Sequence, residues 1–156
     1  MAFQHDRLDV YRLSLDVSAR VFRLLKRVAR DVGGLRNQLL RAVISITLNI
    51  AEGAEEFSPA DKARFYRFAR RSAAECAACL DTLVAWGELK QTDIREIKRL
   101  LGWIVGKLTN MIAAMEARLG STSVPTPGSR DEPMPVPMRM PMPIPFPPRE
   151  PNPITR

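Results

Sequence analysis

Arginine is the residue type in this chain whose number and spacing most favour a chemical role. One group recurs along a predicted helix in the first thirty residues, and a second follows a helix start near residue 59. The second group opposes the positive end of the helix dipole, so local helix electrostatics do not explain it. Guanidinium groups bind phosphate oxygens through paired hydrogen bonds. The candidate phosphate-binding residues are Arg20, Arg23, Arg27, Arg64, Arg67 and Arg71.

The alternative interpretation of these arginines is a solvated helix face partly paired with acidic residues. No motif in the sequence specifies base recognition, so any nucleic-acid binding is expected to depend on the phosphate backbone or on shape.

Other residues with chemical potential are few. Cys76 and Cys79 form a C-x-x-C pattern, but they lie deep inside a predicted helix rather than at its N-terminus, where a reactive thiol would be favoured. A zinc site needs four ligands, and His5 is the only histidine in the chain. We therefore expect two buried thiols, no metal site, no cofactor and no catalytic set.

Composition divides the chain after Gly120. The predicted domain 1–120 carries 20 Lys and Arg against 14 Asp and Glu, a net charge of +6 of the +7 of the whole chain, and residues 121–156 hold 12 of the 13 prolines. A basic domain favours a polyanionic partner such as RNA or DNA. The N-terminus has no apolar run, and no segment approaches the roughly 20 apolar residues of a membrane span, so we expect a cytoplasmic protein with no membrane partner.

Four helical patterns follow one another within 1–120, over about 8–30, 35–54, 59–86 and 92–119. Ser58 and Pro59 mark the start of the third, and Gly33, Gly34, Gly87 and Gly120 mark ends. Helices of this length joined by short loops predict an all-α, up-down-up-down antiparallel four-helix bundle. In the fourth, Gly102 and Gly106 form a G-x-x-x-G pattern that predicts close approach of a neighbour, or room for a tryptophan.

The second pattern is apolar over most of its circumference. A helix in a small bundle needs one apolar stripe, so this one is expected to be covered on more than one side, by another subunit. Its polar residues fall on one narrow line, for which we predict a structural role in bonding across the bundle. They are Gln38, Arg41, Ser45, Asn49 and Glu52.

The tail 121–156 alternates proline with methionine, valine, isoleucine and phenylalanine. This composition favours disordered polyproline II chain. Its alternatives are a solvated tail without a partner and a docking strand for an aromatic groove.

Three segments carry a resemblance to a known family: LDVYRLSLDVSARVFRL, QLLRAVISITLNIAEG and ARFYRFARRSAAEC. The chain resembles, over about residues 3–119, the four-helix bundle family named after proteins encoded in intervening sequences of bacterial 23S ribosomal RNA genes. The most specific piece is Asn49–Gly53, preceded by Gln38, Arg41 and Ser45. Further matching positions in the third helix are Arg64, Phe65, Ala69, Ser72 and Glu75.

The resemblance implies a homopentamer with a central channel and no enzymatic activity. A related branch is the accessory variability protein (Avd) of diversity-generating retroelements, a basic pentamer that binds a reverse transcriptase and RNA. We therefore expect a non-enzymatic homopentameric scaffold that binds nucleic acid. The alternative is a protein–protein adaptor, docking a reverse transcriptase or using its tail. Glu55-Glu56-Phe57 replaces the usual loop motif, and the tail lies outside the family pattern.

Overall fold

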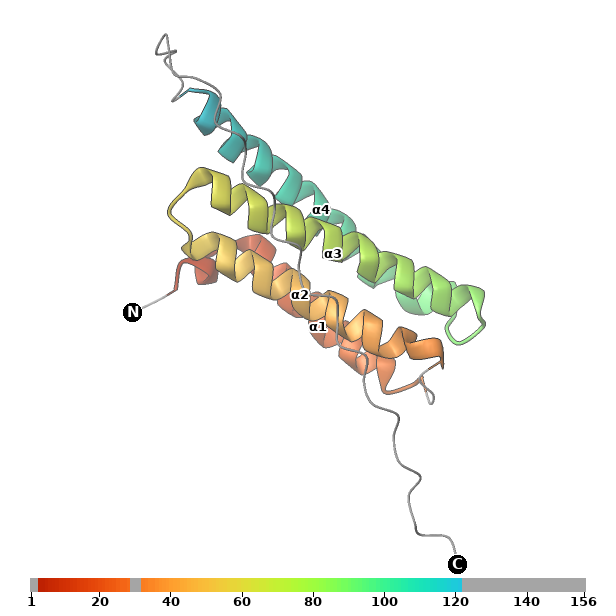
Figure 1. Ribbon diagram of the computed structural model, residues 1–156. Helices are drawn as coiled ribbons and strands as arrows, with labels where there is room; N and C mark the ends of the chain where they lie inside the picture. Colours follow the sequence, from red (N-terminus) through yellow and green to blue (C-terminus); the bar gives the residue numbers. More distant parts are fainter. Residues whose placement is uncertain (1–2, 29–31, 122–156) are drawn as a thin grey trace, which may run out of the picture. The chain divides into compact units, whose positions relative to one another are not determined.

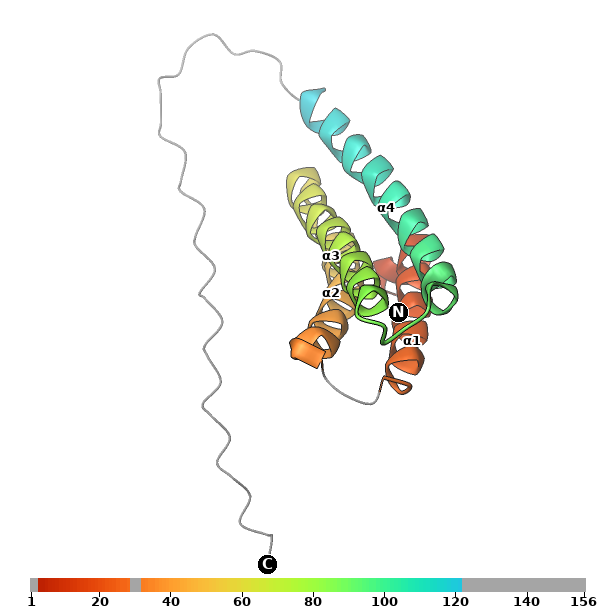
Figure 2. The ribbon, with the colours of Figure 1, turned by 90° about the vertical axis from the view of Figure 1, so that its right-hand side faces the viewer.

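The computed structural model describes residues 3–28 and 32–121 and folds them into four α-helices. Consecutive helices run in opposite directions (Figure 1), and each packs against two others, so that α1 and α3 both contact α2 and α4. Figure 2 views the same bundle from the side. The all-α up-down four-helix bundle predicted from the sequence is confirmed. Its elements are η1 (Gln4–Arg7), α1 (Asp9–Leu25), η2 (Val32–Gly34), α2 (Leu35–Glu55), α3 (Pro59–Ala85) and α4 (Gln91–Gly120).

The core lies along the axis between the four helices. Each helix contributes aliphatic side chains spaced three or four residues apart, as the helical period requires. Fully buried examples, one from each helix, are Val17, Ile46, Leu80 and Ile104. This single core fixes which side of each helix faces solvent, and so where the arginines lie.

The first helix ends at Leu25, whereas the sequence pattern predicted a helix to about Arg30. The backbone tightens there into three-residue turns, with Arg27 N bonded to Leu24 O at 3.0 Å and Val28 N to Leu25 O at 3.3 Å. The guanidinium of Arg36 donates to the carbonyl oxygens of Leu25 and Val28. A side chain from α2 therefore satisfies the last carbonyl of α1 and a carbonyl in the turn that follows, which a periodicity argument does not include. Arg30 itself lies outside the described residues.

The start of α3 follows its sequence signal. The hydroxyl of Ser58 accepts a hydrogen bond from Asp61 N at 3.5 Å, and Pro59 occupies the first turn. At the other side of this connection, α2 and α3 pack closely together at Gly53. A methyl group on Gly53 would lie 2.7 Å from Cε1 of Tyr66 and 3.0 Å from Cβ of Phe65. The glycine is therefore required by the close contact of the two helices.

The glycines of α4 behave differently from Gly53. A methyl group on Gly102 or Gly106 would meet nothing within 4 Å, so the described residues do not make the close approach that the G-x-x-x-G pattern predicted. Among the residues that the structure describes, no helix combines the length and apolarity needed to cross a membrane. The predicted tail lies outside the described residues from residue 122 onward.

Candidate nucleic-acid interface

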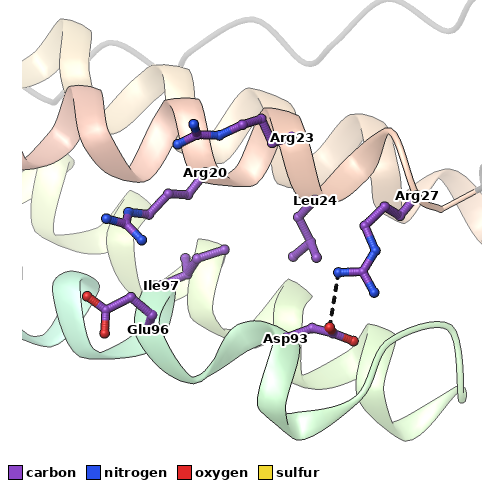
Figure 3. Close-up of a pocket in the computed structure, with 7 residues that line it drawn as sticks. All are labelled: Arg20, Arg23, Leu24, Arg27, Asp93, Glu96 and Ile97. Atoms are coloured by element: carbon purple, nitrogen blue, oxygen red, sulfur yellow. Dashed lines mark hydrogen bonds and ion pairs between the residues drawn. The ribbon is translucent and has the colours of Figure 1, made fainter.

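Two arginines of α1, Arg20 and Arg23, and Arg27 in the turn after it line a groove between α1 and α4 with a volume of about 510 Å³. Arg20 and Arg27 extend towards α4, while Arg23 lies farther from it (Figure 3). Arg27 pairs with Asp93 of α4 at 3.1 Å, and Nε of Arg20 donates to Asp16 of its own helix at 2.9 Å. This first set of predicted residues is thus brought together, but most of its charge is already matched.

Two carboxylates, those of Asp93 and Glu96, also line the α1–α4 groove. Glu96 accepts two hydrogen bonds from Arg99, at 2.9 and 2.7 Å, and these bonds lower the pKa of the Glu96 carboxyl. The pKa of Asp93 is lowered by the backbone amide of Lys90 and then by Arg27. Both acids therefore stay ionised at neutral pH and compete with any phosphate for the same guanidinium groups.

The arginines of α3 line a second groove, between α3 and α4, with a volume of about 540 Å³. Its lining includes Arg67, Arg70 and Arg71 together with Ala74, Val105 and Thr109, and no carboxylate. Arg67 pairs with Glu116, and Arg70 donates to the Thr109 hydroxyl at 3.4 Å. Within residues 3–28 and 32–121, no carboxylate lies within ion-pairing distance of Arg71. This groove carries the larger unmatched positive charge.

Arg64 was grouped with Arg67 and Arg71 on sequence spacing, but it does not line this groove. It pairs with Asp61 at 3.4 Å, and its guanidinium lies 5.1 Å from the centre of the Phe65 ring. Arg70, which was not among the candidates, takes its place. The spacing of Arg67, Arg70 and Arg71 at i, i+3 and i+4 was the available signal, but only the position of α4 decides which of these side chains share a groove.

The polar line of α2 faces α3. The hydroxyls of Ser45 and Ser72 are 2.9 Å apart, and the Gln38 amide donates to the Glu75 carboxylate. Arg41 in turn donates to the Gln38 side-chain oxygen at 2.6 Å. These contacts connect α2 to α3 at fixed positions along both helices.

The remaining residues of that line act locally. Asn49 donates to the carbonyl and hydroxyl oxygens of Ser45, at 2.8 and 3.0 Å, so it bonds along its own helix and reaches α3 only through Ser45. The side chain of Glu52 is exposed. Gly53 makes the close contact with α3 described above.

The two cysteines are free and buried on α3. Burial raises the pKa of the Cys76 thiol to about 12, and it also raises the pKa of Cys79. His5 lines neither arginine groove, and its Nδ1 is 3.3 Å from the Glu55 carboxylate. The described residues contain no cluster of three or more His, Cys, Asp or Glu side chains that could hold a metal ion.

The outward face of α2 remains apolar at the surface of the chain. Ile44 and Leu48 are 49% and 54% exposed. Leu15 and Phe22 of α1 and Phe68 of α3 are also about half exposed. Neighbouring helices of the same chain therefore cover only part of the apolar circumference of α2.

Comparison with protein families places the chain beside a family of known description. The model of a family described as 23S rRNA-intervening sequence protein matches residues 6–110, which is more than half of the chain. The match includes α1, α2 and α3, both groups of arginines and the polar line of α2. Comparison with curated proteins finds no match.

Proposed function

The chain belongs to the 23S rRNA-intervening sequence protein family, and from this premise we propose that it is a non-enzymatic scaffold that assembles as a homopentamer and binds RNA or DNA. The backbone phosphates, rather than the bases, are the recognised groups. The proposal places the principal contacts at Arg67, Arg70 and Arg71.

The observation that carries the nucleic-acid part is the absence of carboxylates among the residues lining the α3–α4 groove. Three guanidinium groups there converge on one groove, and two of them, Arg70 and Arg71, have no carboxylate partner in the described chain. A phosphate entering this groove displaces at most the Arg67–Glu116 ion pair, which is exposed and therefore weak. In the α1–α4 groove it would compete with Asp16, Asp93 and Glu96.

The observation that supports assembly is the exposed apolar face of α2. Ile44 and Leu48 lie one helical turn apart on this face, with Phe68 exposed on α3. Burying a leucine or isoleucine side chain contributes about 1.5–3 kcal/mol. The number five comes from the family resemblance alone. A ring of five domains of +6 would carry roughly +30, which concentrates polyanions through counterion release.

The salt dependence follows from the number of phosphates bound. If one copy neutralises three phosphates, the logarithmic slope of affinity against salt is about −2 for single strands and about −3 for duplex DNA. Affinity per copy should therefore fall roughly 20- to 40-fold between about 50 and 200 mM salt.

The experiment is a salt-titrated binding assay on the full chain, with a 20-nucleotide RNA and a duplex DNA of the same length as probes. Mass is measured by light scattering in the same samples. Arg71→Glu should weaken binding and flatten the salt slope by about one unit or more. Arg12→Glu is the matched control, because it makes the same change of charge on exposed α1, away from both grooves.

The two parts of the proposal fail separately. Affinity that barely changes with salt, or that falls equally in Arg71→Glu and Arg12→Glu, overturns phosphate binding at the α3–α4 groove. A particle of one chain overturns assembly. Leu48→Glu should reduce the particle mass, while Ala78→Glu, which places the same charge on exposed α3, should leave it unchanged.

A further inference from the structure

A third groove lies at the end of the bundle where α2 passes into α3, and it is not used by the proposed function. It has a volume of about 530 Å³. Phe3 and His5 form one wall, Phe57 of the α2–α3 connection forms another, and Phe65 of α3 closes it. Phe57 is 95% exposed. An aromatic side chain this exposed, beside three other aromatic rings, forms a surface suited to a ligand that packs against rings.

The wall formed by Phe3 and His5 is held in place by specific contacts. Glu55 accepts a hydrogen bond from Gln4 N at 2.8 Å and lies 3.3 Å from Nδ1 of His5. The Phe3 ring stacks on His5 with 5.3 Å between ring centres, and His5 packs on Tyr11 at 4.5 Å. The groove is therefore built by contacts between segments fifty residues apart.

The charge at this groove is negative, in contrast to the rest of the domain. Glu52, Glu55 and Glu56 line it, and neither lysine nor arginine does. Three carboxylates repel a phosphate backbone, so nucleic acid is a poor occupant. The combination of aromatic rings and carboxylates is instead suited to an extended proline-rich peptide that carries arginine. Rings bind the proline and aliphatic side chains, and carboxylates bind the guanidinium.

The chain itself contains such a peptide. Residues 133–149 read PMPVPMRMPMPIPFPPR, with eight prolines, apolar residues between them, and Arg139 and Arg149 as the only charged residues. This composition favours polyproline II, in which three residues make one turn and little conformational entropy is lost on binding. We propose that the groove formed by Phe3, His5, Phe57 and Phe65 docks residues 133–149 of a second copy of this chain. Every copy supplies one groove and one segment, so the occupant is present wherever the groove is.

The test uses the full chain and the methionine methyl groups as probes. Four of the seven methionines, at 134, 138, 140 and 142, lie in the proposed docking segment. A Phe57→Ala chain carrying ¹³C-methyl methionine supplies labelled segments and an impaired groove. Phe57 is almost fully exposed, so its replacement leaves the fold intact. Adding an excess of unlabelled wild-type chain should shift the methyl resonances of these four methionines.

Four unlabelled partners make the result specific. The wild-type chain and Phe22→Ala should bind the labelled segment equally, because Phe22 is an exposed ring on α1 outside the groove. Unlabelled Phe57→Ala should bind at least about tenfold more weakly, since one buried ring is lost from the contact. The pair Glu52→Gln and Glu56→Gln should also weaken binding, and added salt should weaken the wild-type interaction.

Three results would overturn the proposal. If unlabelled wild-type chain shifts none of the four methyl resonances, the segment does not dock. If unlabelled Phe57→Ala shifts them as strongly as wild type does, the segment docks on another surface. A change in particle mass in Phe57→Ala without any methyl shift would show that the groove is a contact between helical domains, which also contradicts the proposal.

Discussion

Replacing Gly53 with alanine adds one methyl group at a position where α2 and α3 are in close contact. The methyl carbon would lie 2.7 Å from Cε1 of Tyr66 and 3.0 Å from Cβ of Phe65. Tyr66 is only 4% exposed, so its ring cannot move into solvent. The Phe65 Cβ is attached directly to the α3 backbone, so relief of that contact requires the two helices to move apart.

The size of the effect follows from two opposing contributions. Alanine is a better helix former than glycine by about 1 kcal/mol in a helix interior. Inserting a methyl group into a packed interface costs about 1–3 kcal/mol. The Gly53→Ala chain should therefore lie between unchanged and about 2 kcal/mol less stable than wild type.

The matched control is Gly106→Ala on α4, where the new methyl group meets nothing within 4 Å. That chain should gain about 1 kcal/mol, so the two variants should differ by about 1–3 kcal/mol. The measurement is urea unfolding followed by circular dichroism, with thermal unfolding as a second assay. A difference of this size corresponds to roughly 2–12 °C in Tm for a chain of this length.

The reasoning is refuted if Gly53→Ala is as stable as Gly106→Ala or more stable. Combining Gly53→Ala with Tyr66→Leu provides a further check, because removing the ring relieves the shorter of the two contacts. The cost of Gly53→Ala should then be smaller in the Tyr66→Leu background than in wild type.

Three other predictions concern the helix contacts and the thiols. Ser72→Ala should lower the free energy of unfolding by about 1 kcal/mol, because it leaves the Ser45 hydroxyl without its partner on α3. The double variant Ser45→Ala, Ser72→Ala should have a stability closer to that of wild type. Urea titration measures both variants, and equal losses of stability would contradict the contact. Cys76 should resist a thiol reagent in the folded chain and react when urea is added, because burial raises its pKa to about 12 and leaves little thiolate. Rapid labelling of Cys76 in the folded chain would contradict this prediction. For the same reason, the free energy of unfolding should fall as pH rises from about 9 towards 12, because Cys76 then loses its thiol proton in the unfolded chain but keeps it in the folded chain. Urea titrations at several pH values measure this dependence, and Cys76→Ala should make it less steep.

The order and type of the helices could be predicted from local signals. The 3.6-residue period of apolar side chains identified four helices, and Ser58 with Pro59 identified the start of the third. The first helix was predicted too long because its end depends on Arg36, a residue of the next helix. That contact exists only after α1 and α2 have packed together.

The candidate arginine site could be predicted in part. Residue type identified Arg67 and Arg71 as phosphate-binding candidates, because their number and position on α3 have no local explanation. The exchange of Arg64 for Arg70 required knowledge of α4, since Val105 and Thr109 form the opposite wall of the groove. Likewise, the ion pair between Arg27 and Asp93 of α4 joins residues 66 positions apart in the sequence.

The sequence by itself determined the helical period, the polar line of α2, the two buried thiols and the apolar excess of α2, because each of these is a property of one helix and its neighbours along the chain. Only the tertiary structure decided which charges face one another, that Gly53 is held against Tyr66 whereas Gly102 and Gly106 are open, and that Phe3 and His5 meet Phe57 in an acidic groove. Side-chain contacts between helices depend on the rotation and level of each helix in the bundle, and the packing of the whole core sets those two quantities.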